Sequence, residues 1–137
     1  MARHKNLQHQ RSAMTKFKFY IGGYFGTSFL VKLVKDELHF YISDYPVDFS
    51  SEKPRHIIPT KDNLDWQKLV KFLNLLDWKR HYKNDDILDG TQWEISFVGE
   101  KSKLTSYGSN EYPIEFNKLI RLLRTITRKH FIPFDLY

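Results

Sequence analysis

Aromatic and basic side chains alternate along the first apolar segments of the chain, and such side chains can stack on bases and contact phosphates. Between residues 16 and 42, apolar residues recur at every second position, which indicates β-strands with one buried and one exposed face. The exposed face would gather Lys18, Tyr20, Lys32, His39 and Tyr41. Sheets that bind RNA use aromatic and basic residues in this way, but the same residue types are also ordinary on a solvated sheet face. By the same alternation, the face would extend to Gln92, Glu94 and Ser96.

A glycine-rich connection, GGYFGTS, follows the first of these segments and superficially resembles a phosphate-binding loop. It lacks the lysine that such a loop carries before Thr27, and a strand pattern follows where a helix should begin. A phosphate loop is therefore excluded. Tyr24 and Phe25 would lie at the tip of a hairpin, where they are interface anchors if exposed and cover the core if buried.

The stretch TSYGSNEYP combines turn-forming residues with the expected start of a helix. Gly108 and Asn110 tolerate left-handed backbone in a turn. Pro113 suits the first position of a helix, and Glu115 would place negative charge in its first turn. Helix-entry chemistry accounts for these residues. The functional alternative is an anion site on the free N–H groups of the helix start, with Ser109 and Asn110 assisting.

Catalytic and metal-binding patterns are not assembled in the sequence. The chain has no cysteine and its six histidines are scattered, with no H-E-x-x-H or G-x-S-x-G pattern. Asp85, Asp86 and Asp89 form an acidic loop, but their register does not match a calcium-binding loop. We therefore expect no enzymatic activity, no cofactor and no metal, with a weak cation site at the acidic loop as the alternative.

These residues must be positioned by an α+β fold with a largely antiparallel sheet. Alternation predicts strands at residues 16–21, 29–34, 38–42, 92–97 and 104–107. Helical spacing predicts helices at 62–80, with Thr60 or Asp62 as N-cap, and at 113–128. The expected order is β-β-β-α-β-β-α, a five-stranded sheet with both helices on one face. Residues 44–60 hold three prolines and are expected to form a loop, with a short edge strand at 55–58 as an alternative.

Charge and hydropathy suggest three regions: a disordered basic arm at 1–15, one domain at 16–130 and a tail at 131–137. Five of the 22 Lys and Arg residues lie within residues 1–18, which hold no acid, so the rest is nearly balanced by its 16 acids. Met14 is an alternative start of the chain. No apolar run is long enough to span a membrane and no secretory signal is evident. We expect a cytoplasmic protein without membrane contact.

The C-terminal third resembles a group of small bacterial proteins of uncharacterised function. The resemblance rests on the tryptophan-bearing segment DGTQWEISF followed by YGSNEYPIEF before the last helix. It implies a family but no activity, and no site residue comes with it. The composition and the missing catalytic patterns favour a non-enzymatic module that binds another protein, for instance an immunity-type protein. The alternative is a nucleic-acid-binding domain that uses the basic arm and the aromatic and basic sheet face.

Overall fold

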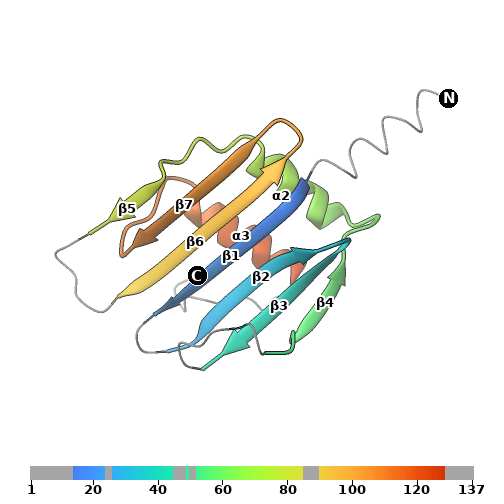
Figure 1. The fold of residues 1–137 in the computed structure, drawn as a ribbon, viewed down its shortest axis with the longest axis horizontal. Coiled ribbons are helices and arrows are strands. Elements are labelled where there is room, and N and C mark those ends of the chain that lie inside the picture. The colour runs from blue at the N-terminus through green and yellow to red at the C-terminus, as the bar shows by residue number, and fades with distance from the viewer. Residues whose placement is uncertain (1–13, 24–25, 45–48, 50–51, 85–89, 129–137) are drawn as a thin grey trace.

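A computed structural model describes residues 14–23, 26–44, 49, 52–84 and 90–128 as a sheet with two helices packed on one face (Figure 1). The strands are β1 (Met14–Gly23), β2 (Ser28–Val34), β3 (Glu37–Ser43), β4 (His56–Pro59), β5 (His81–Lys83), β6 (Thr91–Gly99) and β7 (Lys103–Ser109). The helices are α2 (Leu64–Leu73) and α3 (Phe116–Ile126). The expected α+β class and the expected helix layer are confirmed.

The sheet has seven strands in the order β4-β3-β2-β1-β6-β7-β5, so the prediction of five strands was wrong. All neighbours pair antiparallel except β5 and β7, which are parallel. The two additional strands are the edges. β4 falls close to the alternative edge strand at residues 55–58, whereas β5 has three residues and no alternation that could reveal it. Figure 1 shows β1, the first strand of the chain, in the middle of the sheet.

The core lies between the sheet and the helices. Phe17, Phe19 and Ile21 of β1 are buried on the face that the helices cover, as their alternation predicts. β6 adds Trp93 and Ile95 to the same layer. β1 also begins at Met14 rather than Lys16, because Met14 is itself buried and pairs with Gly99 across a register irregularity. Residues 14 and 15, which were expected to belong to the arm, are therefore part of β1.

Helix α2 is shorter than expected at both ends. Neither Thr60 nor Asp62 caps it; Asn63 does, because its Oδ1 accepts the backbone N–H of Trp66 at 3.0 Å. The helix stops at Leu73, where the predicted helix continued to residue 80. Trp78 instead leaves the helical path to pack against Trp93 and Phe116, so burial of this large side chain prevails over helical propensity.

Helix α3 begins at Phe116, so Pro113 is not its first residue and Glu115 is not in its first turn. Glu115 precedes the helix with a left-handed φ of 74° and makes no side-chain cap. Gly108 belongs to β7 and not to the turn, whereas Asn110 has the left-handed φ of 60° that the sequence suggested. Gly108 is required for another reason: a Cβ there would overlap the indole of Trp93, its partner across the sheet.

The stretch TSYGSNEYP holds the parallel strand β5 in place. Ser106 Oγ donates to the carbonyl of Lys79 at 2.6 Å, and Tyr107 N donates to the carbonyl of Arg80 at 2.9 Å. The carboxylate of Glu111 accepts the backbone N–H of Lys83 at 2.9 Å. These contacts attach residues 79–83 to residues 106–111.

Candidate binding surface on the open sheet face

The sheet face opposite the helices carries most of the residues that the sequence suggested for binding. The strand register aligns Lys18 with Lys32 and Lys32 with His39, which forms one row across β1, β2 and β3. The next row contains Tyr20 and Tyr41, one on each side of Leu30. Alternation along each strand thus predicted which side chains share this face. We call this surface the open face.

One part of the open face is closed by Phe49, which the sequence did not connect with it. Phe49 packs on Tyr41 and Tyr20 with ring centroids 5.8 and 6.5 Å away, and together with Leu30 it forms a second hydrophobic cluster. Tyr41 is only 5% exposed as a result, and its ring also lies 5.3 Å from the ammonium of Lys32. Tyr41 is therefore not accessible for stacking on a base. Period-two alternation cannot reveal this cover, because Phe49 lies outside the strands.

Replacing Phe49 by alanine should uncover this part of the open face. We expect a loss of about 1.5–3 kcal/mol in the free energy of unfolding, the value for burying a phenylalanine side chain. The tyrosines of the cluster should also become more accessible to chemical modification, and the measurement is the extent of tyrosine modification. Ile57→Ala on the same side of the sheet is the control, because Ile57 is already half exposed. An unchanged tyrosine accessibility would show that Phe49 does not cover the cluster.

The other end of the open face is hollowed. A depression of about 440 Å³ is lined by side chains of four neighbouring strands, β1, β6, β7 and β5, as well as by backbone. The row through it runs from Tyr20 to Glu94 and Tyr107 and ends at His81. The His81 and Tyr107 rings lie 4.5 Å apart, and Tyr107 is 38% exposed. The remaining lining residues are Lys18, Gln92, Trp93, Gly108 and Ser109.

Sequence reasoning missed Tyr107 and His81 as members of this surface. Tyr107 was predicted to end the strand at residues 104–107 but was not assigned to this face, and His81 lies in a strand too short to be recognised. The alternation of Leu104 and Ser106 with Thr105 and Tyr107 contained the signal for Tyr107. His81 could be placed only by the parallel pairing of β5 with β7, which depends on tertiary contacts.

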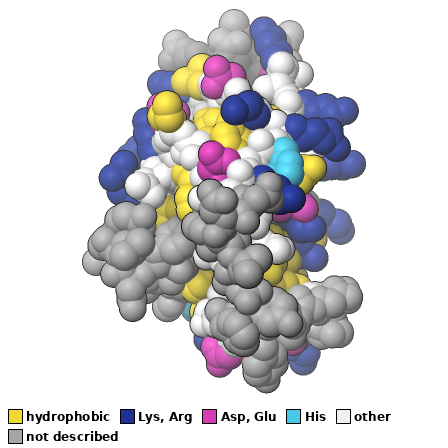
Figure 2. Space-filling view, turned by 90° about the vertical axis from the view of Figure 1, so that its left-hand side faces the viewer, with side chains coloured by type: hydrophobic (Ala, Val, Ile, Leu, Met, Phe, Trp, Pro, Cys, Tyr) yellow, Lys and Arg dark blue, Asp and Glu magenta, His cyan; other side chains and the backbone are white. Residues whose placement is uncertain are grey.

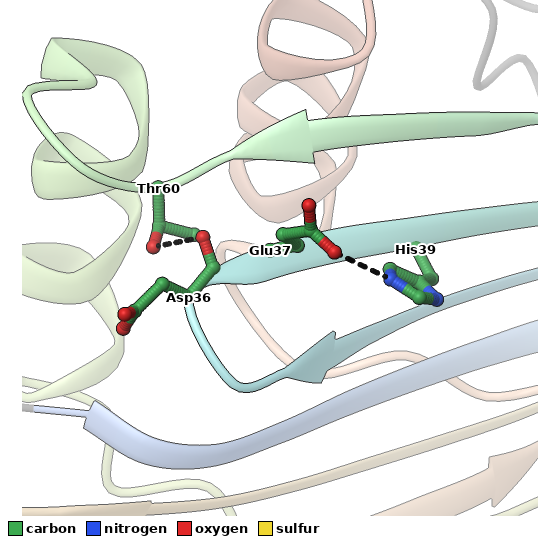
Figure 3. Close-up of polar contacts among 4 residues, drawn as sticks. All are labelled: Asp36, Glu37, His39 and Thr60. Atoms are coloured by element: carbon green, nitrogen blue, oxygen red, sulfur yellow. Dashed lines mark hydrogen bonds and ion pairs between the residues drawn. The ribbon is translucent and has the colours of Figure 1, made fainter.

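The open face is predominantly basic. On its described strands the lysines are Lys16, Lys18, Lys32, Lys83 and Lys103, and the carboxylates are Glu37 and Glu94, as the register and the exposure show. Both carboxylates lie beside a basic side chain. Glu94 is 3.8 Å from the Lys18 ammonium, and Glu37 is 3.2 Å from His39 Nε2 (Figure 3). Within the described residues, Lys16, Lys32 and Lys103 have no carboxylate at ion-pair distance.

The two edges of the sheet are protected against the addition of a further strand. On β4, Pro59 has no N–H group to donate, and its carbonyl accepts the Asn63 side chain at 2.9 Å. Thr60 also holds the strand to the β2–β3 turn through the Asp36 carbonyl at 2.8 Å (Figure 3). On β5, the backbone N–H of Lys83 donates a hydrogen bond to the Glu111 carboxylate, so it is not available to a further strand. Strand addition is therefore disfavoured at both edges.

Ser109 and Asn110 do not form the anion site that was considered for the helix start. Ser109 lines the hollow of the open face, and its carbonyl accepts the N–H of Asn84 at 3.0 Å. Asn110 N donates to the carbonyl of Thr91 at 2.9 Å, so this residue closes the β6–β7 pair. α3 begins only at Phe116.

Some sequence-based predictions concern residues outside the described part of the chain. Tyr24 and Phe25 of the predicted hairpin tip lie there, as do the basic residues before Met14 and the acidic residues Asp85, Asp86 and Asp89. Across the described ranges, no three His, Asp or Glu side chains lie close enough together to bind a metal ion. No helix in these ranges is both long and apolar enough to cross a bilayer.

No family model, no curated protein and no solved structure matches this chain. The resemblance of the C-terminal third to small bacterial proteins therefore remains a sequence-based observation.

Proposed function

We propose that this chain is a non-catalytic cytoplasmic binding protein whose open face contacts an acidic surface of another protein. The observation that carries the proposal is the charge of this face. On the described strands of this face, Lys16, Lys32 and Lys103 have no carboxylate at ion-pair distance, and each of the two glutamates lies beside a basic residue of the same face. An acidic partner would supply the missing negative charge, which steers association and sets specificity. An immunity-type protein that neutralises a toxin is one form of such a module.

The exposed Tyr107 and the partly buried Tyr20 add to the support for a protein partner. Tyrosine is enriched at the centres of protein interfaces, where its ring buries apolar area while its hydroxyl remains hydrogen-bonded. Tyr107 and Tyr20 line the hollow with Gln92 and Ser109 around them. A partner side chain that enters the hollow would find apolar ring surface and polar groups together.

The open face is less suited to nucleic acid than the alternation of its residues suggested. Tyr41 is covered by Phe49, so one of the expected stacking platforms is missing. The remaining tyrosines, Tyr20 and Tyr107, lie on opposite sides of Glu94 in the register. A carboxylate between two stacking platforms repels a phosphate backbone that would follow the bases. These observations favour protein over nucleic acid as the partner of this face.

The test is capture from a native lysate on immobilised full-length chain, with two variants of identical charge change. Lys16→Glu with Lys103→Glu reverses the open face, while Lys68→Glu with Lys71→Glu reverses exposed positions of α2. We expect an acidic protein to be retained by the wild type and by the α2 variant. Its affinity, measured by titration after identification, should fall at least about tenfold in the open-face variant, because several kcal/mol can follow from like charges in an interface.

Two results would overturn the proposal. Retention that is equally weakened by both variants would indicate attraction to net charge and not to the open face. If the retained material is released from the immobilised chain by nuclease treatment, the ligand is nucleic acid and the alternative function is supported.

A further inference from the structure

The outer side of the helix layer is predominantly basic, with the exposed carboxylates of Asp62, Asp77 and Glu115 flanking the two helices. The helical segments Leu64–Leu73 and Phe116–Ile126 carry Lys68, Lys71, Lys118, Arg121 and Arg124, and their only acid is Asp65 in the first turn of α2. All five basic residues are at least partly exposed. The net charge of the chain beyond residue 18 is close to zero, but the two helices hold an excess of basic residues.

This charge arrangement is unfavourable for the helices themselves. Lys68 precedes Lys71 by three positions, as Lys118 precedes Arg121 and Arg121 precedes Arg124. Like charges at this spacing destabilise a helix by about 0.2–0.5 kcal/mol for each pair. The Lys118 ammonium lies 5.5 Å from the Phe72 ring, which orients it across the two helices without neutralising it. An anionic ligand would relieve the repulsion.

Exposed aliphatic side chains lie at both ends of this basic surface. Leu64, Leu75 and Ile114 are 71%, 77% and 88% exposed. Leu64 precedes Lys68 by four positions in α2, so these two side chains adjoin, and Ile114 lies two residues before the start of α3. Solvated aliphatic side chains gain nothing from a phosphate backbone, but they gain free energy where they enter the apolar region of a bilayer.

The two helices present these side chains as one layer. Phe72 contacts Lys118 and Trp78 stacks on Phe116, so the end of α2 adjoins the start of α3. At the opposite end, residues 61–65 and 126–128 border a common groove. The helices are thus antiparallel, with Leu75 and Ile114 at one end and Leu64 at the other. Figure 2 shows the two layers edge-on, with the helix layer on the left and the sheet on the right, and Lys and Arg side chains along both sides.

We propose that the outer side of the helix layer binds the surface of an anionic phospholipid bilayer. The five basic residues would lie over the lipid phosphates, and Leu64, Leu75 and Ile114 would enter the boundary between headgroups and acyl chains. The sequence-based expectation of no membrane contact rested on the missing membrane span, and binding at the surface needs none. This binding uses the side opposite the open face, so a protein partner and a bilayer could be held at once.

The proposal is tested by sedimentation of the full-length chain with phosphatidylcholine vesicles that contain or lack phosphatidylglycerol. We expect binding only to the anionic vesicles. Lys71→Gln with Arg121→Gln should weaken it by about fivefold for each cation removed, the equivalent of about 1 kcal/mol per basic residue. Leu75→Ser with Ile114→Ser should weaken it by about tenfold without a change in net charge, because apolar insertion contributes to surface binding.

The matched control is Lys16→Gln with Lys103→Gln, which removes the same charge from the open face and should leave vesicle binding within about twofold of the wild type. Equal weakening in the control would overturn the proposal in favour of non-specific charge attraction. Serine variants that bind as well as the wild type would overturn it by showing that no apolar insertion occurs. Binding to single-stranded or duplex DNA that depends on Lys71 and Arg121, without vesicle binding, would assign the surface to nucleic acid instead.

Discussion

Replacement of Trp93 by alanine is expected to lower the free energy of unfolding by about 3–5 kcal/mol, a large share of the stability of a small protein. The indole is enclosed by Trp78, Tyr82 and Phe116, with ring centroids at 5.9, 5.9 and 5.0 Å. Its Nε1 donates to the carbonyl of Glu111 at 2.9 Å. The alanine variant would leave a cavity between the sheet and α3 and remove the donor for this carbonyl.

The measurement is urea-induced unfolding followed by far-ultraviolet circular dichroism, with Trp93→Phe as the matched control. Phenylalanine retains much of the buried ring but has no N–H group, so we expect a smaller loss than for alanine. An alanine variant within about 1 kcal/mol of the wild type would contradict the central role of this side chain, since cavity formation alone exceeds that value.

The second large effect is expected from Gly108→Ala, which adds a single methyl group to a β7 position facing Trp93. An ideal Cβ there would lie 2.5 Å from Nε1, 2.6 Å from Cε2 and 2.7 Å from Cζ2 of the indole. Neither the buried ring nor the strand can move aside easily. We expect a loss of about 1–3 kcal/mol in the free energy of unfolding, the range for an overfilled core.

Two controls separate this overlap from a general effect of changing β7. Thr105→Ala alters an exposed position of the same strand and should remain within about 0.5 kcal/mol of the wild type. Gly108→Ala in a Trp93→Phe background should be less destabilising than in the wild type, because the overlapping indole atoms are gone. Such non-additivity is typical of residues in contact. An equal loss in both backgrounds would show that the indole is not the cause.

The meander of β1, β2 and β3 and the position of β6 could be predicted because their apolar residues alternate strictly. Phe17, Phe19 and Ile21 are examples, and alternation also assigned Lys18 and Lys32 to the opposite face. Local patterns were less informative at the helix ends. The apolar residues up to Leu76 continue the helical spacing of α2, but the helix ends at Leu73 because Trp78 is buried against Trp93.

The surfaces were less predictable than the strands, because their accessibility depends on contacts between distant segments. Alternation placed Tyr41 on the open face correctly but could not show that Phe49 covers it. The hollow depends on His81, whose strand exists through hydrogen bonds to β7 and Glu111. The sum of charges beyond residue 18 also concealed that α3 has basic residues and no acid, since a total carries no information about position.

The central position of β1 has a consequence for synthesis on the ribosome. β1 is completed first, but one of its two neighbours in the sheet is β6, with Lys18 opposite Ser96. A nascent chain that has completed only β1, β2 and β3 therefore presents Phe17, Phe19 and Ile21 without the helices that later cover them. Pairing over such a sequence separation slows folding and prolongs the exposure of apolar surface. The apolar face of the early meander is therefore expected to be covered only after β6, β7 and α3 have left the ribosomal tunnel.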